Sequence, residues 1–113
     1  MLEPGETILV GIGFITEMQF PMFYLIEPRS GLLTNYGITV KNAPGIIDSD
    51  YRGEAGVLIC NQSNNSFALR RGMRIAQIIF QEALIPNIEL VEQYENLSSS
   101  ARGAGGFGST GIL

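Results

Sequence analysis

Short runs of β-forming residues alternate with turn residues along the whole of this chain. Between them, no apolar stripe with helical spacing extends beyond two turns. The predicted strands cover residues 7–10, 20–26, 37–40, 56–60, 66–69, 74–80 and 88–92. Many short strands joined by polar turns are typical of a sandwich or jelly roll. The sequence therefore predicts an all-β fold.

The chain has 113 residues, which is the size of one domain with one core. Hydrophobic residues make up 45% of it and charged residues only 16%. We expect an oligomer, because so much apolar surface needs a partner subunit to cover it. The formal net charge of -4 argues against broad binding to nucleic acid, which requires a basic face. A single anionic ligand stays possible if a few arginines and a metal ion converge on it.

The chain contains no histidine and a single cysteine, Cys60. Imidazole bases, serine–histidine triads and cysteine zinc sites are thereby excluded, so any general base must be a carboxylate. A lone cysteine also fits a reducing compartment. The first residues lack the pattern of a signal peptide, and no apolar stretch approaches the ~20 residues of a membrane helix. We expect a soluble protein of the cytoplasm, or of the host cytoplasm or nucleus if the source is viral, with no membrane partner.

One aspartate in the middle of the chain follows an apolar triplet. Asp48 comes directly after residues 45–47, whose sequence Gly-Ile-Ile indicates the end of a buried strand. Burial would make this carboxylate a competent base toward water. Asp-Ser-Asp is also good turn chemistry, so a plain turn aspartate stays open. Tyr51 places an aromatic ring nearby, although a tyrosine at a strand start is more often a packing residue.

One polar cluster and one separate amide side chain have the chemistry to hold phosphate oxygens. In residues 28–32, a proline fixes the backbone, and Arg29 and Ser30 supply a guanidinium and a hydroxyl. The alternative for this cluster is an ordinary exposed turn. Gln77 begins an apolar run and can donate an amide hydrogen to a phosphate, or it can satisfy a neighbouring backbone group.

The C-terminal segment loses the β pattern and becomes rich in serine and glycine. Residues 103–108 match G-x-G-x-x-G, but the strand and helix of a βαβ unit do not flank them, which excludes a Rossmann site. We expect a flexible arm that becomes ordered when a ligand binds; a tail without a role is the alternative. The predicted division is a β domain of residues 1–96 and an arm of residues 97–113.

The arm carries side chains suited to a nucleotide. Arg102 brings positive charge, and Phe107 can stack on a planar base. Ser109 and Thr110 can bond phosphate. Together they favour a flap that closes over a bound ligand.

Taken in order, these segments resemble the motifs of the trimeric deoxyuridine triphosphatases (dUTPases). Residues 28–32 resemble the family's second motif, 45–54 its third, 72–77 its fourth and 102–111 its fifth. The resemblance implies a distorted jelly roll of the β-clip type that forms a homotrimer, with each site built from three subunits. It also implies hydrolysis of dUTP to dUMP and pyrophosphate with Mg²⁺, which limits uracil in DNA and supplies dUMP for dTMP synthesis.

The resemblance further implies a role for each candidate residue. Asp48 matches the family's water-activating aspartate. The uracil and deoxyribose would be held by Asn42, Gly45, Ile47, Tyr51 and Phe107, with the tyrosine disfavouring a 2′-hydroxyl. The triphosphate would be held by Arg29, Ser30, Gln77, Arg102, Ser109 and Thr110, the last three from a neighbouring subunit's arm. No side chain is assigned to the metal, because the triphosphate and waters would hold most of Mg²⁺.

The resemblance is incomplete at its start. The family's first motif, Ala-Gly-x-Asp-Leu, does not occur in the first twenty residues, and residues 20–25 lack the usual glycine-containing turn. Two alternatives therefore stay open. One is a nucleotide-binding or regulatory relative with impaired catalysis. The other is an enzyme of the dCTP deaminase branch, which attacks the base instead of the phosphate; the complete flap around Phe107 counts against it.

Overall fold

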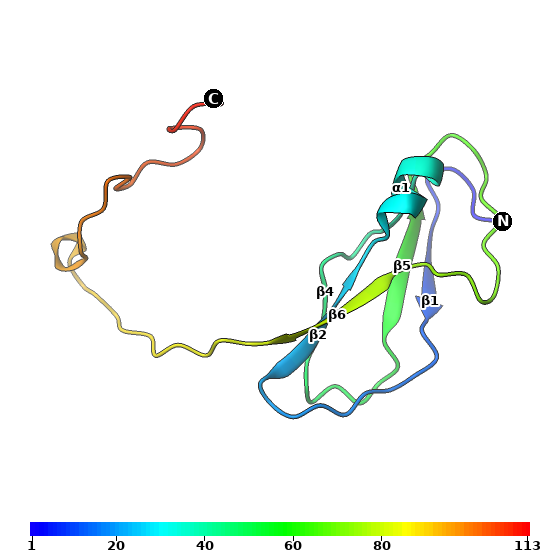
Figure 1. The fold of residues 1–113 in the computed structure, drawn as a ribbon, viewed down its shortest axis with the longest axis horizontal. Coiled ribbons are helices and arrows are strands. Elements are labelled where there is room, and N and C mark those ends of the chain that lie inside the picture. The colour runs from blue at the N-terminus through cyan, green and yellow to red at the C-terminus, as the bar shows by residue number, and fades with distance from the viewer.

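The computed structural model describes residues 1–113, and its folded body contains two antiparallel sheets of three strands each (Figure 1). The strands are β1 (Thr7–Gly11), β2 (Met22–Glu27), β3 (Ile38–Val40), β4 (Gly45–Ile47), β5 (Gly56–Asn61) and β6 (Gln77–Glu82). The one α-helix, α1 (Ser30–Tyr36), follows β2, and a 3-10 helix, η1 (Tyr94–Asn96), lies near the C-terminus. Neither helix has the length and hydrophobicity needed to span a bilayer. The all-β prediction is confirmed.

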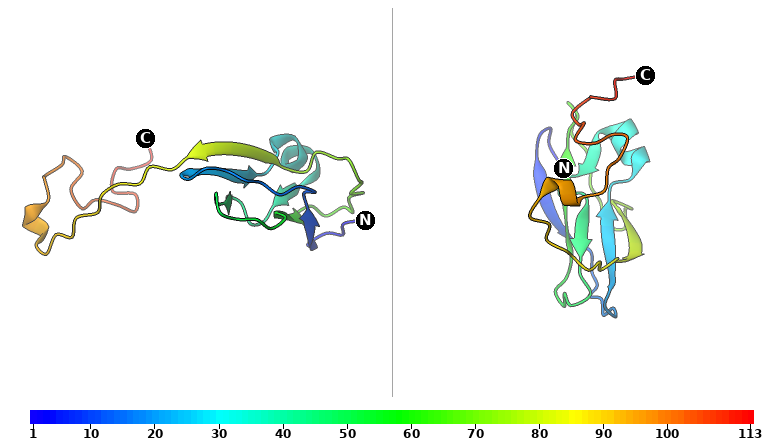
Figure 2. Two further views of the ribbon diagram at one scale, coloured as in Figure 1. Left: turned by 90° about the horizontal axis from the view of Figure 1, so that it is seen from below. Right: turned by 90° about the vertical axis from the view of Figure 1, so that its left-hand side faces the viewer.

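The two sheets have the strand orders β1-β5-β3 and β4-β2-β6. In the first, β5 pairs with β1 from Gly56 opposite Gly11 to Cys60 opposite Thr7. In the second, β2 pairs with β6 along its whole length and with β4 over three residues. Figure 2 shows the sheets as layers, with the C-terminal chain extending away from them. Every pair of neighbouring strands is antiparallel, as in a jelly roll.

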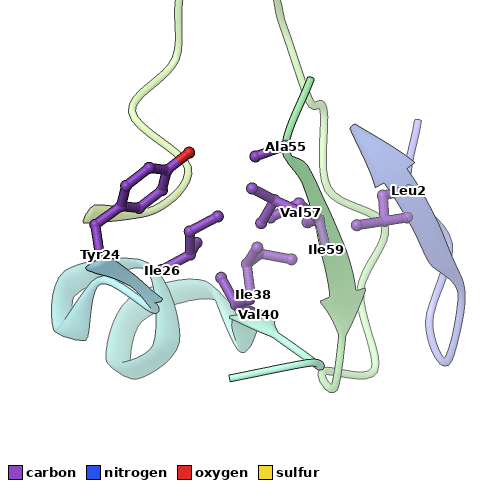
Figure 3. Close-up of a cluster of buried hydrophobic side chains, with 8 residues drawn as sticks. All are labelled: Leu2, Tyr24, Ile26, Ile38, Val40, Ala55, Val57 and Ile59. Atoms are coloured by element: carbon purple, nitrogen blue, oxygen red, sulfur yellow. The ribbon is translucent and has the colours of Figure 1, made fainter. Parts of the chain in front are cut away.

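The hydrophobic core lies between the two sheets. Val57 and Ile59 are fully buried on β5, because side chains two residues apart point to the same face of a strand. Tyr24 and Ile26 follow the same rule on β2. The complete cluster consists of Leu2, Tyr24, Ile26, Ile38, Val40, Ala55, Val57 and Ile59 (Figure 3). Because the inner side chains of β2 are used in this core, a ligand site can be formed only by the exposed side chains and the ends of β2, β4 and β6.

Asn61 is the buried polar side chain at the end of β5. Its Nδ2 donates to the carbonyl oxygens of Leu2 (2.9 Å) and Asn65 (2.8 Å). Its Oδ1 accepts from the backbone N–H of Ser63 (2.9 Å) and from the hydroxyl of that residue (2.7 Å). Both ends of the amide therefore have partners, as burial requires. Asn61 ties the N-terminal segment to the turn that follows β5.

Two of the predicted strands are wrong. Residues 66–69 contribute only an isolated bridge between Leu2 and Phe67, because the N-terminal segment turns away at Gly5, which has φ 80°. Residues 88–92 form no strand, because no other strand of the chain lies beside them to accept their hydrogen bonds. The run predicted for residues 74–80 also begins later, at Gln77, and continues to Glu82.

After β6 the chain leaves the two sheets (Figure 1). Its apolar side chains are almost fully exposed at Leu84 (94%), Ile88 (93%) and Leu90 (89%). Exposed apolar surface of this kind is unfavourable in water unless another surface covers it. The chain departs from the sheets at residue 83, directly after β6. The domain boundary predicted between residues 96 and 97 stays a prediction.

Candidate active site

Asp48 directly follows β4 and opens a loop that covers residues 48–54 (the 48–54 loop). The prediction of a buried carboxylate is wrong for the single chain, because this side chain is exposed. β4 has only three residues and lies at the edge of its sheet, so the chain itself leaves the next residue uncovered. The backbone N–H of Tyr51 donates to the carbonyl oxygen of Asp48 at 3.3 Å, which closes a turn. The turn uses the backbone of Asp48 and leaves its carboxylate free.

Tyr51 folds back along the same loop. Its hydroxyl donates to the carbonyl oxygen of Glu54 at 3.2 Å. A methyl group at Gly53 would lie 2.5 Å from that hydroxyl oxygen, so a side chain there would displace the ring. Tyr51 keeps 44% of its surface exposed, which leaves part of the ring available to a ligand.

Asn42, Gly45 and Ile47 lie together on the turn before β4 and on β4 itself. Gly45 is buried opposite Ile26, and a methyl group on it would lie 3.6 Å from Nδ2 of Asn42. The Oδ1 of Asn42 accepts from the backbone N–H of Leu58 at 3.3 Å, which orients the amide. The structure therefore brings these three predicted site residues close to one another, with Asp48 next along the chain.

Arg29, Ser30 and Gln77 meet where β2 ends and β6 begins. Gln77 pairs with Glu27, and its Nε2 donates to the carbonyl oxygen of Pro28 at 2.8 Å. The structure thus contains the backbone contact considered as the alternative for Gln77, although the second amide hydrogen stays available. Arg29 is the N-cap residue of α1 and Ser30 its first residue. This cluster is the entry to a helix, where the sequence indicated a turn.

The register of the β4-β2-β6 sheet separates this phosphate-type cluster from Asp48. Glu27 of β2 lies opposite Gln77, whereas Tyr24 lies opposite Ile47, the residue before Asp48. Asp48 is therefore displaced by about four residues along β2, or ~13 Å at about 3.3 Å per residue. Within one chain, the two groups lie toward opposite ends of the sheet.

The candidate residues of the arm lie outside both sheets (Figure 1). The Nε of Arg102 donates to the carbonyl oxygen of Gly105, within the arm, at 2.7 Å. Phe107 has a left-handed backbone, with φ 49°, and a fully exposed ring. Ser109 and Thr110 are exposed as well. A single chain in this conformation does not bring these four residues to Asp48.

A large hollow of the chain lies elsewhere. It is a groove of about 800 Å³ between β1 and the turn that carries Arg70, Arg71 and Arg74, and most of its lining is hydrophobic. None of the predicted site residues lines it. This groove is therefore separate from Asp48.

The carboxylates of the chain do not form a metal cage. No group of three or more His, Cys, Asp or Glu side chains is placed to hold a metal ion. Mg²⁺ prefers oxygen ligands, keeps several waters, and is often bound through one or two carboxylates plus substrate phosphates. A metal of this kind does not need a cage of protein carboxylates.

Sequence reasoning missed two residues that hold the 48–54 loop. Nη1 of Arg52 donates to the carbonyl oxygen of Ser49 at 2.6 Å. Oε1 of Glu54 accepts from the backbone N–H of Gly13 at 2.7 Å. The sequence signal was the pair of glycines at positions 11 and 13, but nothing in it connects them with Glu54, which is 41 residues beyond Gly13.

Comparisons with known proteins give a consistent result. The family described as dUTPase matches residues 1–111. The deoxyuridine 5'-triphosphate nucleotidohydrolase of Nautilia profundicola is 50% identical over 111 residues, which are 98% of this chain and 76% of that protein. The protein of the same name from Brucella melitensis biotype 2 is 50% identical over 111 residues, or 98% of this chain and 69% of its own length.

Solved structures agree in fold. A Staphylococcus bacteriophage 80alpha dUTPase with dUpNHpp has a TM-score of 0.79 and 25% identity, and the match covers 98% of this chain and 79% of that one. Native EIAV dUTPase has a TM-score of 0.68 and 22% identity, covering 80% and 74% of the two chains. A mutant dUTPase of phage phi11 of S. aureus, described with a structural Mg(II) ion, has a TM-score of 0.66 and 20% identity, covering 83% and 77%. The expected jelly-roll type of fold is confirmed.

Proposed function

This chain belongs to the dUTPase family and hydrolyses dUTP to dUMP and pyrophosphate, and we propose that the Asp48 carboxylate activates the attacking water. The observation that carries the proposal is the position of Asp48, directly after β4 on the loop that also bears Tyr51. The reaction limits uracil incorporation into DNA and supplies dUMP for dTMP synthesis. The dCTP deaminase branch and a relative without turnover are not favoured, because relatives with 50% identity carry the name of a dUTP-hydrolysing enzyme.

Asp48 acts as a general base in this mechanism. Its ionised carboxylate accepts a proton from a water whose oxygen forms a bond to the α-phosphorus of dUTP. The bond from that phosphorus to the oxygen bridging to the β-phosphorus breaks in line, and its electron pair leaves with pyrophosphate. A covering chain would remove bulk water from the exposed Asp48, and desolvation makes a carboxylate a stronger base.

The turn before β4 and β4 itself recognise the nucleoside. We assign the uracil edge to the Asn42 amide and to the backbone of Gly45 and Ile47, because Asn42 and Gly45 lie beside each other at the start of β4. Tyr51 packs against the deoxyribose and excludes a 2′-hydroxyl by contact. Phe107 stacks on the uracil ring when the arm closes.

We propose that each site is built from three copies of the chain. Asp48 lies ~13 Å along β2 from the Arg29–Ser30–Gln77 cluster of the same chain, at about 3.3 Å per residue, so the cluster of a second chain is better placed to hold the phosphates. Arg102, Ser109 and Thr110 would come from the arm of a neighbouring chain and close the site. The exposed apolar side chains of Leu84, Ile88 and Leu90 support association, which would cover them.

Mg²⁺ is the metal that this donor set fits. It would be held mainly by the triphosphate and waters, and when bound it neutralises negative charge on the phosphate oxygens. Arg29 and Arg102 add guanidinium groups, which suit phosphate oxygens because they can donate two parallel hydrogen bonds. We also propose a cytoplasmic, reducing location, which agrees with the free thiol of Cys60.

Pyrophosphate release from dUTP in the presence of Mg²⁺ tests the role of Asp48. Asp48→Asn keeps the shape of the side chain and removes its basicity, so we expect release to slow by roughly 10²–10⁴-fold. Asp50→Asn is the matched control, since it removes an exposed carboxylate from the same loop and should leave release near the parent rate. Release by Asp48→Asn at the parent rate would show that Asp48 is not the base.

A further inference from the structure

Two side chains join the 48–54 loop to a distant segment of the chain, residues 11–16. Oε1 of Glu54 accepts from the backbone N–H of Gly13 at 2.7 Å. Nη1 of Arg52 donates to Ser49 O at 2.6 Å and lies 3.5 Å from Thr16 O. The loop that carries Asp48 is therefore tied to residues that precede it by more than thirty positions.

Residues 11–13 are shaped to receive the Glu54 carboxylate. A methyl group at Gly11 would lie 2.6 Å from Oε1 and 3.0 Å from Cδ of Glu54, so the carboxylate occupies the place of a side chain at position 11. Gly13, which donates to that carboxylate, has φ 85°, a conformation that side chains disfavour. The backbone N–H of Ile12 also donates to the carbonyl oxygen of Ala55 at 3.1 Å. The position of Glu54 thus depends on both glycines.

Glu54 also contacts Tyr51. Its carbonyl oxygen accepts from the Tyr51 hydroxyl at 3.2 Å, while its side chain accepts from Gly13. Glu54 therefore links residues 11–16 to the aromatic ring of Tyr51. Movement of Glu54 would shift that ring together with the turn that begins at Asp48.

We propose that Glu54 is a positioning residue for dUTP hydrolysis. Its carboxylate packs over Gly11, accepts from Gly13 and so holds the 48–54 loop in place, and Arg52 holds the loop at a second point. We call these contacts the brace, and the place over Gly11 its seat. The inference rests on the roles proposed above for Asp48 and Tyr51. Glu54 does not touch the substrate; it sets the placement of the base and of the ring that contacts the deoxyribose. Because the brace positions Tyr51, its loss changes the selection of the sugar as well as the rate.

The test compares dUTP and UTP as substrates for Glu54→Ala and Glu54→Gln. We expect Glu54→Ala to lower kcat for dUTP about 10-fold and to reduce the ratio of kcat/KM for dUTP over UTP by a similar factor. A loss of folded enzyme would lower both substrates equally and leave the ratio unchanged. Glu54→Gln keeps a carbonyl oxygen that can accept from Gly13, so it should restore most of the rate and of the ratio.

A double-mutant cycle with Gly11 checks the geometry. Gly11→Ala alone should reduce the ratio as Glu54→Ala does, because the new methyl group displaces the carboxylate. In the Glu54→Ala background the same substitution should add little, since the three atoms nearest to that methyl group all belong to the Glu54 side chain. Glu17→Ala serves as the control, because it removes an exposed carboxylate from the adjoining segment and should leave both substrates unaffected.

The outcomes separate this inference from the proposed function. A parent-like ratio in both Glu54→Ala and Gly11→Ala would overturn the brace, as would additive effects in the double variant. If Glu54→Ala does not fold, the comparison of Gly11→Ala with Glu54→Gln decides the same question. An Asp48→Asn variant that keeps the parent rate would instead overturn the assignment of the base.

Discussion

Replacement of Asn61 by alanine should destabilise the folded chain by ~3 kcal/mol. The substitution removes four side-chain hydrogen bonds of 2.7 to 2.9 Å at the end of β5. The bond to Leu2 is buried, and a buried acceptor left without a donor costs about 1–3 kcal/mol. The other three bonds lie in the more exposed turn, where water can replace Asn61, so each contributes roughly 0.5 kcal/mol. The largest part of this loss of stability comes from the carbonyl oxygen of Leu2, which is left buried without a donor.

Urea unfolding measures this difference. The parent and Asn61→Ala are compared at the same protein concentration, since association adds to apparent stability. The midpoint should fall while the m-value stays the same, because the surface exposed on unfolding does not change. Asn64→Ala is the control in the same turn, where the exposed side chain should change stability by no more than about 0.5 kcal/mol. A loss below about 1 kcal/mol for Asn61→Ala would refute the assigned role of the buried amide.

Two further predictions concern the loop and the arm. Gly53→Ala places a methyl group 2.5 Å from the Tyr51 hydroxyl, so the ring must move and the preference for dUTP over UTP should fall by about 10-fold, as measured by kcat/KM for each. Removal of the residues after Leu97 should slow pyrophosphate release by roughly 100-fold and leave the far-ultraviolet circular dichroism of the sheets intact, because none of the core residues belongs to the arm. Parent-like selectivity in the first variant, or parent-like release in the second, would contradict the corresponding role.

Two of the correctly predicted strands, β2 and β5, place alternate side chains in the core. On β5, Val57 and Ile59 point into the core, and the same spacing places Tyr24 and Ile26 there from β2. Residues 88–92 are equally rich in β-forming types, yet they form no strand in a single chain. A pattern of residue types indicates that a strand is possible, but its hydrogen bonds depend on a neighbouring strand, which the local pattern does not specify.

The candidate site divides in a similar way. The position of Asp48 at the end of a strand followed from the apolar triplet before it, and so did the proximity of Tyr51. The burial of Asp48 did not follow, because exposure depends on whether other elements cover an edge strand. The brace at Glu54 was also hidden, since Gly11 and Gly13 are recognised as its seat only when β1 and β5 lie side by side.

Residue types and their order determined the all-β class, the family and the identity of the one carboxylate that follows β4, because these depend on local chemistry and on spacing along the chain. Tertiary structure alone decided the register of the β4-β2-β6 sheet, which places Asp48 toward one end and Gln77 at the other. It also decided that Asn61 is buried with all its hydrogen bonds made, and that Glu54 reaches Gly13. Distances between residues far apart in sequence arise from packing the whole chain at once, and no local pattern contains them.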